Sequence, residues 1–170
     1  KNLADKAKIK HPNLAVEWGQ YIVAPSQITI YKVISKKNIE KANARAWYIV
    51  DGSFMNDLKD TWAIHQKWHA IPVNNMTNSV KSVWLAGSTC DSDDKYTAGG
   101  EYILMPDFKD GDQYVAILDT GAYQDALSSK HCLLSAPAKI VVQDGDAKVI
   151  RKRETAESMG KQFGWNGDHK

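Results

Sequence analysis

The sequence has 170 residues, of which 43% are hydrophobic, so it is long enough for one folded domain with its own core. Its 22 basic and 20 acidic residues leave a formal charge of +2, which is too balanced to indicate a nucleic-acid or membrane-surface partner. No apolar run approaches the roughly 18 residues that cross a bilayer, and two cysteines, Cys90 and Cys132, are too few for a disulfide framework, so we expect a protein of a reducing, cytoplasmic compartment.

The N-terminal segment has the pattern of the end of a different domain. Residues 2–10 are rich in helix formers and predict a short helix, which His11-Pro12-Asn13 ends because proline disfavours helix in the residue before it. Residues 14–17 form a short apolar run that ends in the carboxylate of Glu17. A helix and a strand with a functional residue at the C-terminal end of the strand are typical of a (β/α)₈ barrel. We therefore expect residues 1–19 to be the last helix and strand of such a barrel, whose remainder is missing from this sequence.

Residues 20–170 have the pattern of a β-rich domain. Short apolar or β-branched runs alternate with turns, and the run 46–50 is continuous enough to indicate a buried strand. Such a series of short strands with few helical turns predicts a mainly β fold, which we expect to be a Greek-key-like antiparallel β-barrel with short helices; a sandwich is the alternative. The predicted strands cover residues 21–24, 28–34, 46–50, 67–73, 81–86, 101–105, 113–118, 138–143 and 147–153.

Three local signals place turns and helices between these strands. Ser53 is placed to cap a short helix that ends near Asp57, because a serine side chain accepts a hydrogen bond from a free amide of the first helical turn. Asp144-Gly145 predicts a hairpin turn, since this pair readily adopts positive φ. A last helix is expected over residues 155–163.

The candidate functional residues follow two of the predicted strands. The apolar run 82–86 ends at a Gly/Ser turn followed by Cys90 and Asp91, so a thiol and a carboxylate stand where scaffolds usually present reacting groups. A second run, residues 114–118, leads to a turn that exposes the phenol of Tyr123. A cysteine at such a place is more often inert packing than a reactive group, so the pattern alone leaves both interpretations open.

These motifs together resemble the C-terminal half of the fold-type-III pyridoxal-phosphate decarboxylases, and within them most closely the biosynthetic arginine decarboxylases. The resemblance runs from about His11 to Glu154. It implies a (β/α)₈ barrel domain followed by an antiparallel β-domain. The runs that indicate arginine decarboxylase are 11–13, 58–66, 90–93 and 121–124, whereas 51–57 and 151–155 match a pattern shared with diaminopimelate and ornithine decarboxylases.

The resemblance also implies roles for residues around the substrate. Cys90 helps to protonate the carbon that has lost carbon dioxide, and Asp91 contacts the distal cationic group of the substrate. Asp93 and Asp94 either add negative charge that suits a cation or form a solvated turn. His131 stands where many relatives carry an aromatic pocket residue and bacterial arginine decarboxylases a histidine, although a histidine by itself is more often structural. Both Cys90 and Asp91 enter the site of a neighbouring subunit, which implies a homodimer or higher homo-oligomer.

The cofactor implied by the resemblance is pyridoxal 5'-phosphate. Glu17 faces its pyridine nitrogen, because a protonated ring makes the cofactor an electron sink, and Gly19 and Tyr123 help to hold its phosphate. Two residues depart from the family pattern: Gln20 replaces an arginine and lacks the charged fork that grips a phosphate, and Cys132 replaces a common asparagine for no evident physical reason. The Schiff-base lysine lies in the missing barrel domain, so we expect the chain alone to be inactive. No metal is expected.

The resemblance thus implies an enzyme that decarboxylates a small basic amino acid, with arginine to agmatine in polyamine biosynthesis as the first expectation. Ornithine, lysine and diaminopimelate are alternative substrates. A catalytically inactive relative that regulates or assembles with an active enzyme, and a separate β-domain used only for binding, are alternatives of other classes.

Overall fold

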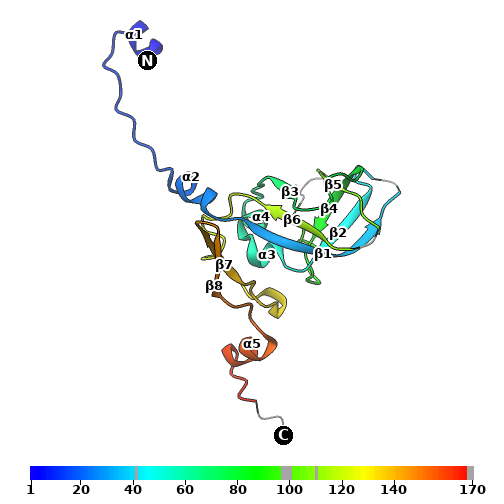
Figure 1. Cartoon of the computed structure of the whole chain (residues 1–170). Coiled ribbons are helices and arrows are strands. Elements are labelled where there is room, and N and C mark those ends of the chain that lie inside the picture. The colour runs from blue at the N-terminus through cyan, green and yellow to red at the C-terminus, as the bar shows by residue number, and fades with distance from the viewer. Residues whose placement is uncertain (41, 97–100, 110, 168–170) are drawn as a thin grey trace.

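The computed structural model describes residues 1–40, 42–96, 101–109 and 111–167. Its centre is a six-stranded sheet in the order β3-β6-β1-β2-β4-β5, and β7 and β8 form a separate hairpin (Figure 1). The strands are β1 (Thr29–Asn38), β2 (Ala46–Val50), β3 (Ala70–Pro72), β4 (Val80–Ala86), β5 (Ile103–Pro106), β6 (Gln113–Ile117), β7 (Lys139–Gln143) and β8 (Asp146–Arg151). The helices are α1 (Asn2–Lys6), α2 (Gly19–Val23), α3 (Phe54–Asp57), α4 (Lys59–Ala63) and α5 (Ala156–Gln162), with 3₁₀ turns η1 (Ala24–Ser26) and η2 (His131–Leu133).

The six-stranded sheet curls into a nearly closed barrel, because its two edge strands, β3 and β5, contact each other. Adjacent strands pair antiparallel except β2 and β4, which run parallel with Ala46 opposite Val83. This parallel pair differs from the fully antiparallel barrel predicted from the sequence. Between β2 and β4 the chain forms α3, α4 and β3, and a crossover of that length brings the second strand back in the direction of the first.

The core of the barrel also fixes the position of α3. In β2 alternate side chains are buried from Ala46 to Val50, as expected for a strand with one face toward the core. Phe54, the first residue of α3, is fully buried in the same core and packs against the rings of Tyr31 and Tyr96. Burial of such a side chain contributes about 1.5–3 kcal/mol. The short helix is therefore held by the barrel rather than by its own length.

The local predictions from the sequence are confirmed. The run 46–50 is strand β2, and the Ser53 side chain accepts a hydrogen bond from the Asn56 amide at the start of α3. Asp144 and Gly145 have φ of 52° and 89° in the β7–β8 turn. Thr155 caps α5 through a reciprocal pair of hydrogen bonds with the third residue of the helix.

The N-terminal predictions are partly wrong. Residues 21–24 were predicted as a strand, but they belong to α2 and η1. Residues 14–17 form no strand. They lie in the N-terminal arm, residues 1–18, which precedes α2 and in which Leu14 is 90% exposed. For residues 21–24 the physical reason is that a strand without a neighbour leaves its backbone N–H and C=O groups unpaired, whereas a short helix pairs some of them locally. The predicted helix over 2–10 is limited to α1, which ends at Lys6.

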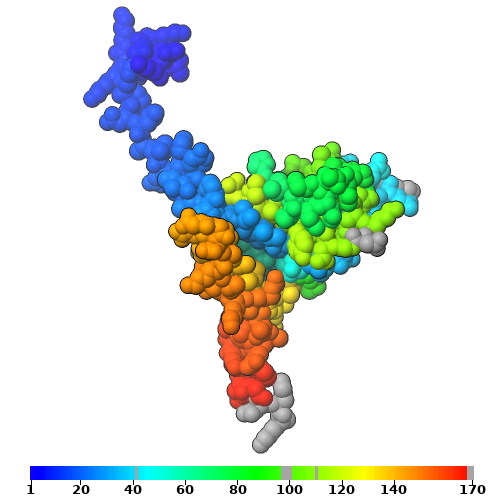
Figure 2. All heavy atoms as spheres, in the orientation of Figure 1, coloured from blue at the N-terminus to red at the C-terminus, as the bar shows by residue number. Residues whose placement is uncertain are grey.

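The β7–β8 hairpin was predicted as part of the barrel but stands outside it (Figure 1). The carboxylate of Asp125 anchors its base, accepting from the Lys139 ammonium at 2.9 Å and the Arg151 guanidinium at 2.7 Å. Figure 2 shows the N-terminal arm and the C-terminal segment projecting from the barrel in different directions. Across the described ranges, no helix has the length and apolar character to cross a bilayer.

Candidate active site

The loop that follows β4, residues 87–95, carries Cys90 and Asp91 and is fixed by a buried carboxylate. Asp94 is 3% exposed, and its Oδ1 accepts hydrogen bonds from the backbone amides of Phe54 (2.8 Å) and Met55 (3.3 Å) at the start of α3. Its Oδ2 accepts from the hydroxyl of Thr89 at 2.7 Å. A side chain at Gly87 would collide with this carboxylate, so glycine is required where the chain leaves β4.

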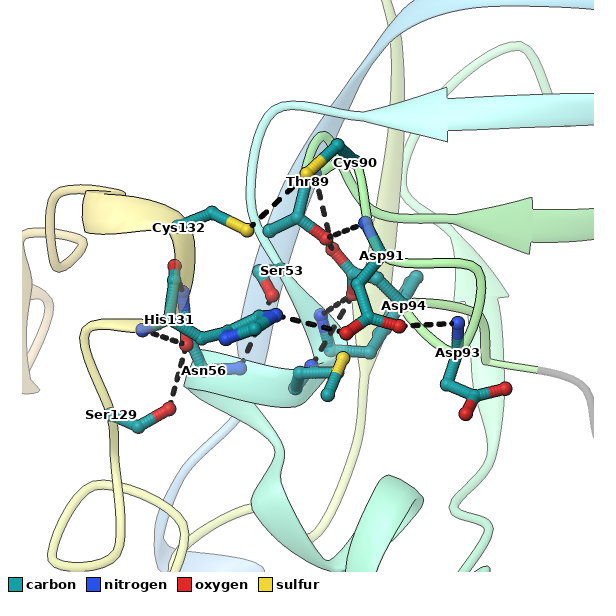
Figure 3. Close-up of polar contacts among 12 residues, drawn as sticks. Ser53, Asn56, Thr89, Cys90, Asp91, Asp93, Asp94, Ser129, His131 and Cys132 are labelled. Atoms are coloured by element: carbon teal, nitrogen blue, oxygen red, sulfur yellow. Dashed lines mark hydrogen bonds and ion pairs between the residues drawn. The ribbon is translucent and has the colours of Figure 1, made fainter.

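The side chains of Cys90 and Asp91 emerge from this loop toward residues 131–132 (Figure 3). The Cys90 sulfur lies 3.7 Å from the Cys132 sulfur, and both cysteines are exposed. Asp91 Oδ2 lies 3.0 Å from His131 Nε2, while Oδ1 accepts from the Asp93 amide at 2.9 Å. These contacts, the Asp93 amide first and His131 after it, hold the pKa of Asp91 below its usual value, so its carboxylate is ionised at neutral pH.

The second loop, residues 129–132, is held by the side-chain amide of Asn56. Its Nδ2 donates to the His131 carbonyl at 2.9 Å, and its Oδ1 accepts from the His131 amide at 3.0 Å and the Ser129 hydroxyl at 2.7 Å (Figure 3). Cys132 has left-handed φ of 55° and ψ of 20°. Asparagine adopts this conformation more readily than most residues. This gives a physical reason for the asparagine that is common at this position in the resembling family.

α3 is therefore the common support of both loops, with Asp94 bound at its start and Asn56 projecting from it. Sequence reasoning placed Asp94 among the charges that would face a cation or solvent, and that is wrong because the carboxylate points into the protein. Asn56 and Gly87 were not singled out. The role of Asn56 depends on contacts with residues that lie 73 to 75 positions further along the chain. The role of Gly87 depends on the burial of Asp94 in the same loop, which no local pattern in the sequence indicates.

Glu17, Gly19 and Tyr123 lie apart from this group. Glu17 is on the exposed arm and Gly19 begins α2. Gly121, two residues before Tyr123, donates its amide to the carbonyl of Ala24 at 2.9 Å, so the turn that carries Tyr123 packs against the end of α2. Among the described residues, no hydrogen bond or ion pair joins Glu17 or Tyr123 to the Cys90 loop.

The polar groups of Glu17 and Tyr123 and the space at Gly19 fit the chemistry of pyridoxal phosphate. In the described part of the chain, the Glu17 carboxylate and the Tyr123 hydroxyl have no protein partner, and open space surrounds Gly19. A free carboxylate suits a protonated ring nitrogen, and a free hydroxyl suits a phosphate oxygen. Gln20 is already engaged, since its side chain donates to that of Gln66 at 3.2 Å. Within the same ranges, no group of three or more His, Cys, Asp or Glu side chains is placed to hold a metal ion.

A family model described as pyridoxal-dependent decarboxylase, C-terminal sheet domain, matches residues 20–121. The chain belongs to this family. The predicted family and the mainly β fold of its sheet domain are thus confirmed. The diaminopimelate decarboxylase of Staphylococcus aureus (strain COL) is 31% identical to this sheet-domain chain over 151 residues, which make up 89% of the chain and 34% of that relative. The chain therefore spans about a third of the length of the curated relative it matches.

Solved structures support the same fold. The diaminopimelate decarboxylase of M. jannaschii in complex with L-lysine is 25% identical, with a TM-score of 0.70 and coverage of 95% of this chain and 35% of that one. The biosynthetic arginine decarboxylase of Campylobacter jejuni has a TM-score of 0.76 over 97% of this chain and 43% of that one. Its sequence identity is 15%, so this likeness shows the fold alone. The Staphylococcus aureus relative matched by sequence is thus a diaminopimelate decarboxylase, and the Campylobacter jejuni arginine decarboxylase is a structural neighbour.

Proposed function

We propose that this chain is the C-terminal part of a pyridoxal-phosphate-dependent decarboxylase of a basic amino acid, with arginine as the substrate and agmatine as the product. The observation that carries the proposal is the pair of adjacent residues Cys90 and Asp91, whose side chains point outward from a loop that the buried carboxylate of Asp94 holds in place. A proton donor beside a carboxylate of lowered pKa suits a reaction in which one end of the substrate is protonated and the other end is a cation.

Asp91 binds the distal cation of the substrate in this proposal. Each of its oxygens already takes part in one protein contact, with the Asp93 amide or with His131. A carboxylate oxygen has two lone pairs, so both oxygens keep one free for the parallel N–H groups of a guanidinium. His131 contacts Asp91 and holds it in place. Cys90 then supplies its thiol proton to the substrate carbon from the same loop.

Glu17, Gly19 and Tyr123 are the residues that we assign to the cofactor. When bound, pyridoxal phosphate supplies an electron sink for the bond that breaks. The Glu17 carboxylate keeps the ring nitrogen protonated, and the Tyr123 hydroxyl and the open approach at Gly19 receive the phosphate. Because this group shares no polar contact with the Cys90 loop within the described residues, we propose that the Cys90 loop of one copy meets the cofactor residues of a second copy.

The arm before residue 20 supports the domain division predicted from the sequence. Its apolar side chains, Leu14 and Val16 among them, are largely exposed in this chain. Contiguous exposed apolar side chains are typical of a surface that another part of a protein covers. We therefore propose that residues 1–19 belong to a preceding (β/α)₈ barrel, which also brings the lysine that binds the cofactor.

Diaminopimelate is the second candidate substrate, and the 31% identity to the Staphylococcus aureus enzyme favours it. L-lysine is the product of diaminopimelate decarboxylation, and its binding to the M. jannaschii enzyme agrees with that enzyme's name. Diaminopimelate carries a carboxylate as well as an ammonium at its distal end, so its pocket needs a cation beside Asp91. In this alternative, His131 is the side chain that we assign to the distal carboxylate, because its ring nitrogen lies 3.0 Å from Asp91. Arginine needs the carboxylate only.

The test is an assay of the full-length parent enzyme, loaded with the cofactor, for release of carbon dioxide from arginine, ornithine, lysine and diaminopimelate. We expect the highest kcat/KM with arginine. A higher kcat/KM with diaminopimelate would contradict arginine as the substrate, but it would still support a decarboxylase. If none of the four releases carbon dioxide while the cofactor is bound, the chain belongs to an inactive relative and the enzyme proposal is wrong.

A further inference from the structure

The two cysteines of this chain are in contact although they are 42 residues apart in the sequence. Cys90 comes from the loop after β4 and Cys132 from η2, and their sulfur atoms are 3.7 Å apart (Figure 3). The proposed reaction uses the Cys90 thiol and gives Cys132 no role. The contact therefore needs an explanation of its own.

The approach of the two thiols is set by anchored backbone on both sides. On one side, the buried carboxylate of Asp94 ties the Cys90 loop to the first amides of α3. On the other side, the amide of Asn56 holds both the N–H and the C=O of His131, the residue immediately before Cys132. Because the same four-residue helix carries both anchors, neither loop can move far without breaking hydrogen bonds that are buried at Asp94 and partly buried at Asn56.

The two sulfur atoms are in non-bonded contact at 3.7 Å. Bonded sulfur atoms lie about 2.05 Å apart, so rotation of the two side chains has to bring the sulfurs, which are 3.7 Å apart, closer by about 1.65 Å. Both thiols are exposed, so a small reagent reaches them. A pair held in this way favours bond formation within one chain over bonds between chains, because the partner thiol is always present.

We propose that Cys90 and Cys132 form a reversible redox pair, in which a peroxide converts the two thiols into an intrachain disulfide. The regulatory consequence rests on the proposed function: the disulfide removes the proton that Cys90 supplies and so switches the decarboxylase off. Reduction by a dithiol restores both thiols.

The two steps balance as follows. The Cys90 thiolate attacks one oxygen of hydrogen peroxide, the O–O bond breaks, and the departing hydroxide takes a proton to become water. The resulting sulfenic acid has its S–O bond broken when the Cys132 sulfur attacks, and a second water leaves with the Cys132 proton. The two sulfurs together give up two electrons, and the peroxide accepts them.

The roles of the two thiols follow from their surroundings. Partial desolvation raises the pKa of the Cys132 thiol, and contact with Cys90 adds to the effect. The raised pKa leaves Cys132 with less thiolate at neutral pH than an ordinary cysteine, so we assign it the role of the resolving thiol and assign the first reaction with peroxide to Cys90. The neighbouring carboxylate of Asp91 acts in the same direction on Cys132.

The decisive test needs no enzyme activity. The reduced 170-residue chain is treated with one equivalent of hydrogen peroxide and analysed by intact mass and by peptide mapping without reduction. We expect a loss of about 2 Da, which corresponds to two hydrogen atoms, and one cross-linked peptide that joins Cys90 to Cys132. Dithiothreitol should reverse both. Disulfide-linked dimers, or a chain that gains oxygen without the cross-link, would overturn the proposal.

The matched controls are Cys132→Ser and Cys90→Ser. With Cys132→Ser, the sulfenic acid at Cys90 has no resolving partner, so dimedone should trap it and longer exposure should carry it to the irreversible sulfinic acid. With Cys90→Ser, oxidation of the remaining thiol should be several-fold slower. Equal recovery with dithiothreitol after prolonged oxidation of the wild type and of Cys132→Ser would contradict a redox pair.

The activity of the full-length parent separates this proposal from the proposed function. If the cross-link forms and the reduced parent decarboxylates, peroxide should abolish turnover and dithiothreitol should restore it. If the cross-link forms in a parent without decarboxylase activity, the redox pair stands and the proposed function fails. If the parent is active and the cross-link never forms, the redox pair fails.

Discussion

Cys90 and Asp91 are neighbours in the chain, yet they face different contacts, and this separates the effects expected from each. The Cys90 sulfur contacts another sulfur, whereas the Asp91 carboxylate is held in an ionised state by an amide and a histidine. One group can give a proton, and the other can only accept or bind a cation at neutral pH. A substitution at each position should therefore alter a different kinetic constant.

In the full-length parent, Cys90→Ala should lower kcat by about 10²–10⁴-fold and change KM little, because a positioned proton donor contributes about that much. Asp91→Ala should mainly raise KM for the cationic substrate, since it leaves the distal charge without a partner. Steady-state kinetics measure kcat and KM of both variants, and the absorbance of the bound cofactor checks that each variant is folded. Cys132→Ala is the matched control for loss of a thiol. Unchanged kinetics in Cys90→Ala and Asp91→Ala would return both residues to a structural role.

Asp57 gives a prediction about stability. It lies in α3, where its carboxylate accepts hydrogen bonds from the Ser53 amide at 3.1 Å and the Tyr31 hydroxyl at 3.4 Å. Burial is the largest influence and raises the pKa of Asp57 to about 6, above the 3.8 of an unperturbed aspartate. The folded state thus binds a proton at Asp57 more tightly than the unfolded state, so the contribution of Asp57 to stability is greatest below pH 4 and falls as the pH rises through 6.

Asp57→Asn keeps the acceptor oxygen and removes the charge. We expect this variant to have a higher free energy of unfolding than the wild type at pH 7.5, by about 1–3 kcal/mol. The gain should disappear at pH 4, where the wild-type carboxyl is protonated as well. Urea unfolding at the two pH values tests the prediction, and an equal difference at both pH values would contradict it.

At the scale of elements, α3 connects two loops that are far apart in the sequence. Asn56→Ala removes the amide that holds His131 and Ser129, and leaves the backbone N–H and C=O of His131 without their partner. Unsatisfied groups of this kind cost about 1–3 kcal/mol each when buried, and less where water can reach them. The η2 segment should then move more freely relative to Cys90.

The expected result for Asn56→Ala is a free energy of unfolding lower by about 1–3 kcal/mol and a slower peroxide cross-link between Cys90 and Cys132. Urea unfolding and the rate of cross-linking, measured by mass, report the two effects. Ser129→Ala is the control, because it removes one contact to Asn56 and leaves both backbone contacts of His131 intact. A normal cross-linking rate in a destabilised Asn56→Ala would show that the loop is held by other contacts.

Glu154 joins three segments of the chain, at Lys130, at Ala136 and in α5. Its carboxylate pairs with the Lys130 ammonium, accepts from the Ala136 amide at 2.8 Å, and accepts from the Gln162 side chain of α5 at 3.0 Å. These contacts, with Lys130 first, lower the pKa of Glu154 to about 2 from 4.5. Because the folded value is the lower one, the stabilisation is present above pH 4.5 and is lost as the pH falls toward 2.

Glu154→Gln should therefore lower the midpoint of thermal unfolding at pH 7, and the difference from the wild type should shrink below pH 4.5. Scanning calorimetry at pH 7 and pH 3 measures it. Glu157→Gln is the matched control, since its pair with Lys161 is exposed on both sides and contributes little. An equal loss in the two variants would contradict a special role for Glu154.

The elements also show which parts of the fold follow from local sequence. β2, the Ser53 cap and the Asp144-Gly145 turn were predicted correctly because each depends on a few consecutive residues. Residues 21–24 were predicted as a strand from their β-rich character, but no strand in the described part of the chain pairs with them, and they lie in α2 and η1. The parallel pairing of β2 with β4 likewise depends on a crossover that strand patterns do not reveal.

The candidate site divides in the same way. The positions of Cys90 and Asp91 after β4 were predictable from an apolar run that ends at a turn. The burial of Asp94 was not, because an aspartate in an acidic loop usually faces solvent. Likewise, no local pattern in the sequence indicates that residues 129–132 lie against the Cys90 loop. Only the resemblance placed His131 and Asp91 around the same substrate, and α3 holds the two loops in contact.

At the scale of the whole molecule, the barrel has its own core, whereas the residues assigned to the cofactor do not form an enclosed site. The buried side chains of β1, β2, β4 and β6 pack together with Phe54 inside the barrel. Glu17 and Gly19, in contrast, lie on or beside an arm whose apolar side chains are exposed. Folding and cofactor binding should therefore be separable in this chain.

The 170-residue chain should unfold cooperatively in urea and bind pyridoxal phosphate weakly or not at all, because its core is complete and its cofactor residues lack enclosure. It should also self-associate at high concentration, since the arm exposes Leu14 and Trp18. Absorbance during titration with the cofactor measures binding, sedimentation measures association, and Leu14→Ser is the variant that should weaken association while leaving the urea transition unchanged. A tight adduct that borohydride traps on one specific lysine of this chain would mean that the cofactor site does not depend on a barrel domain, and the domain proposal would then be wrong.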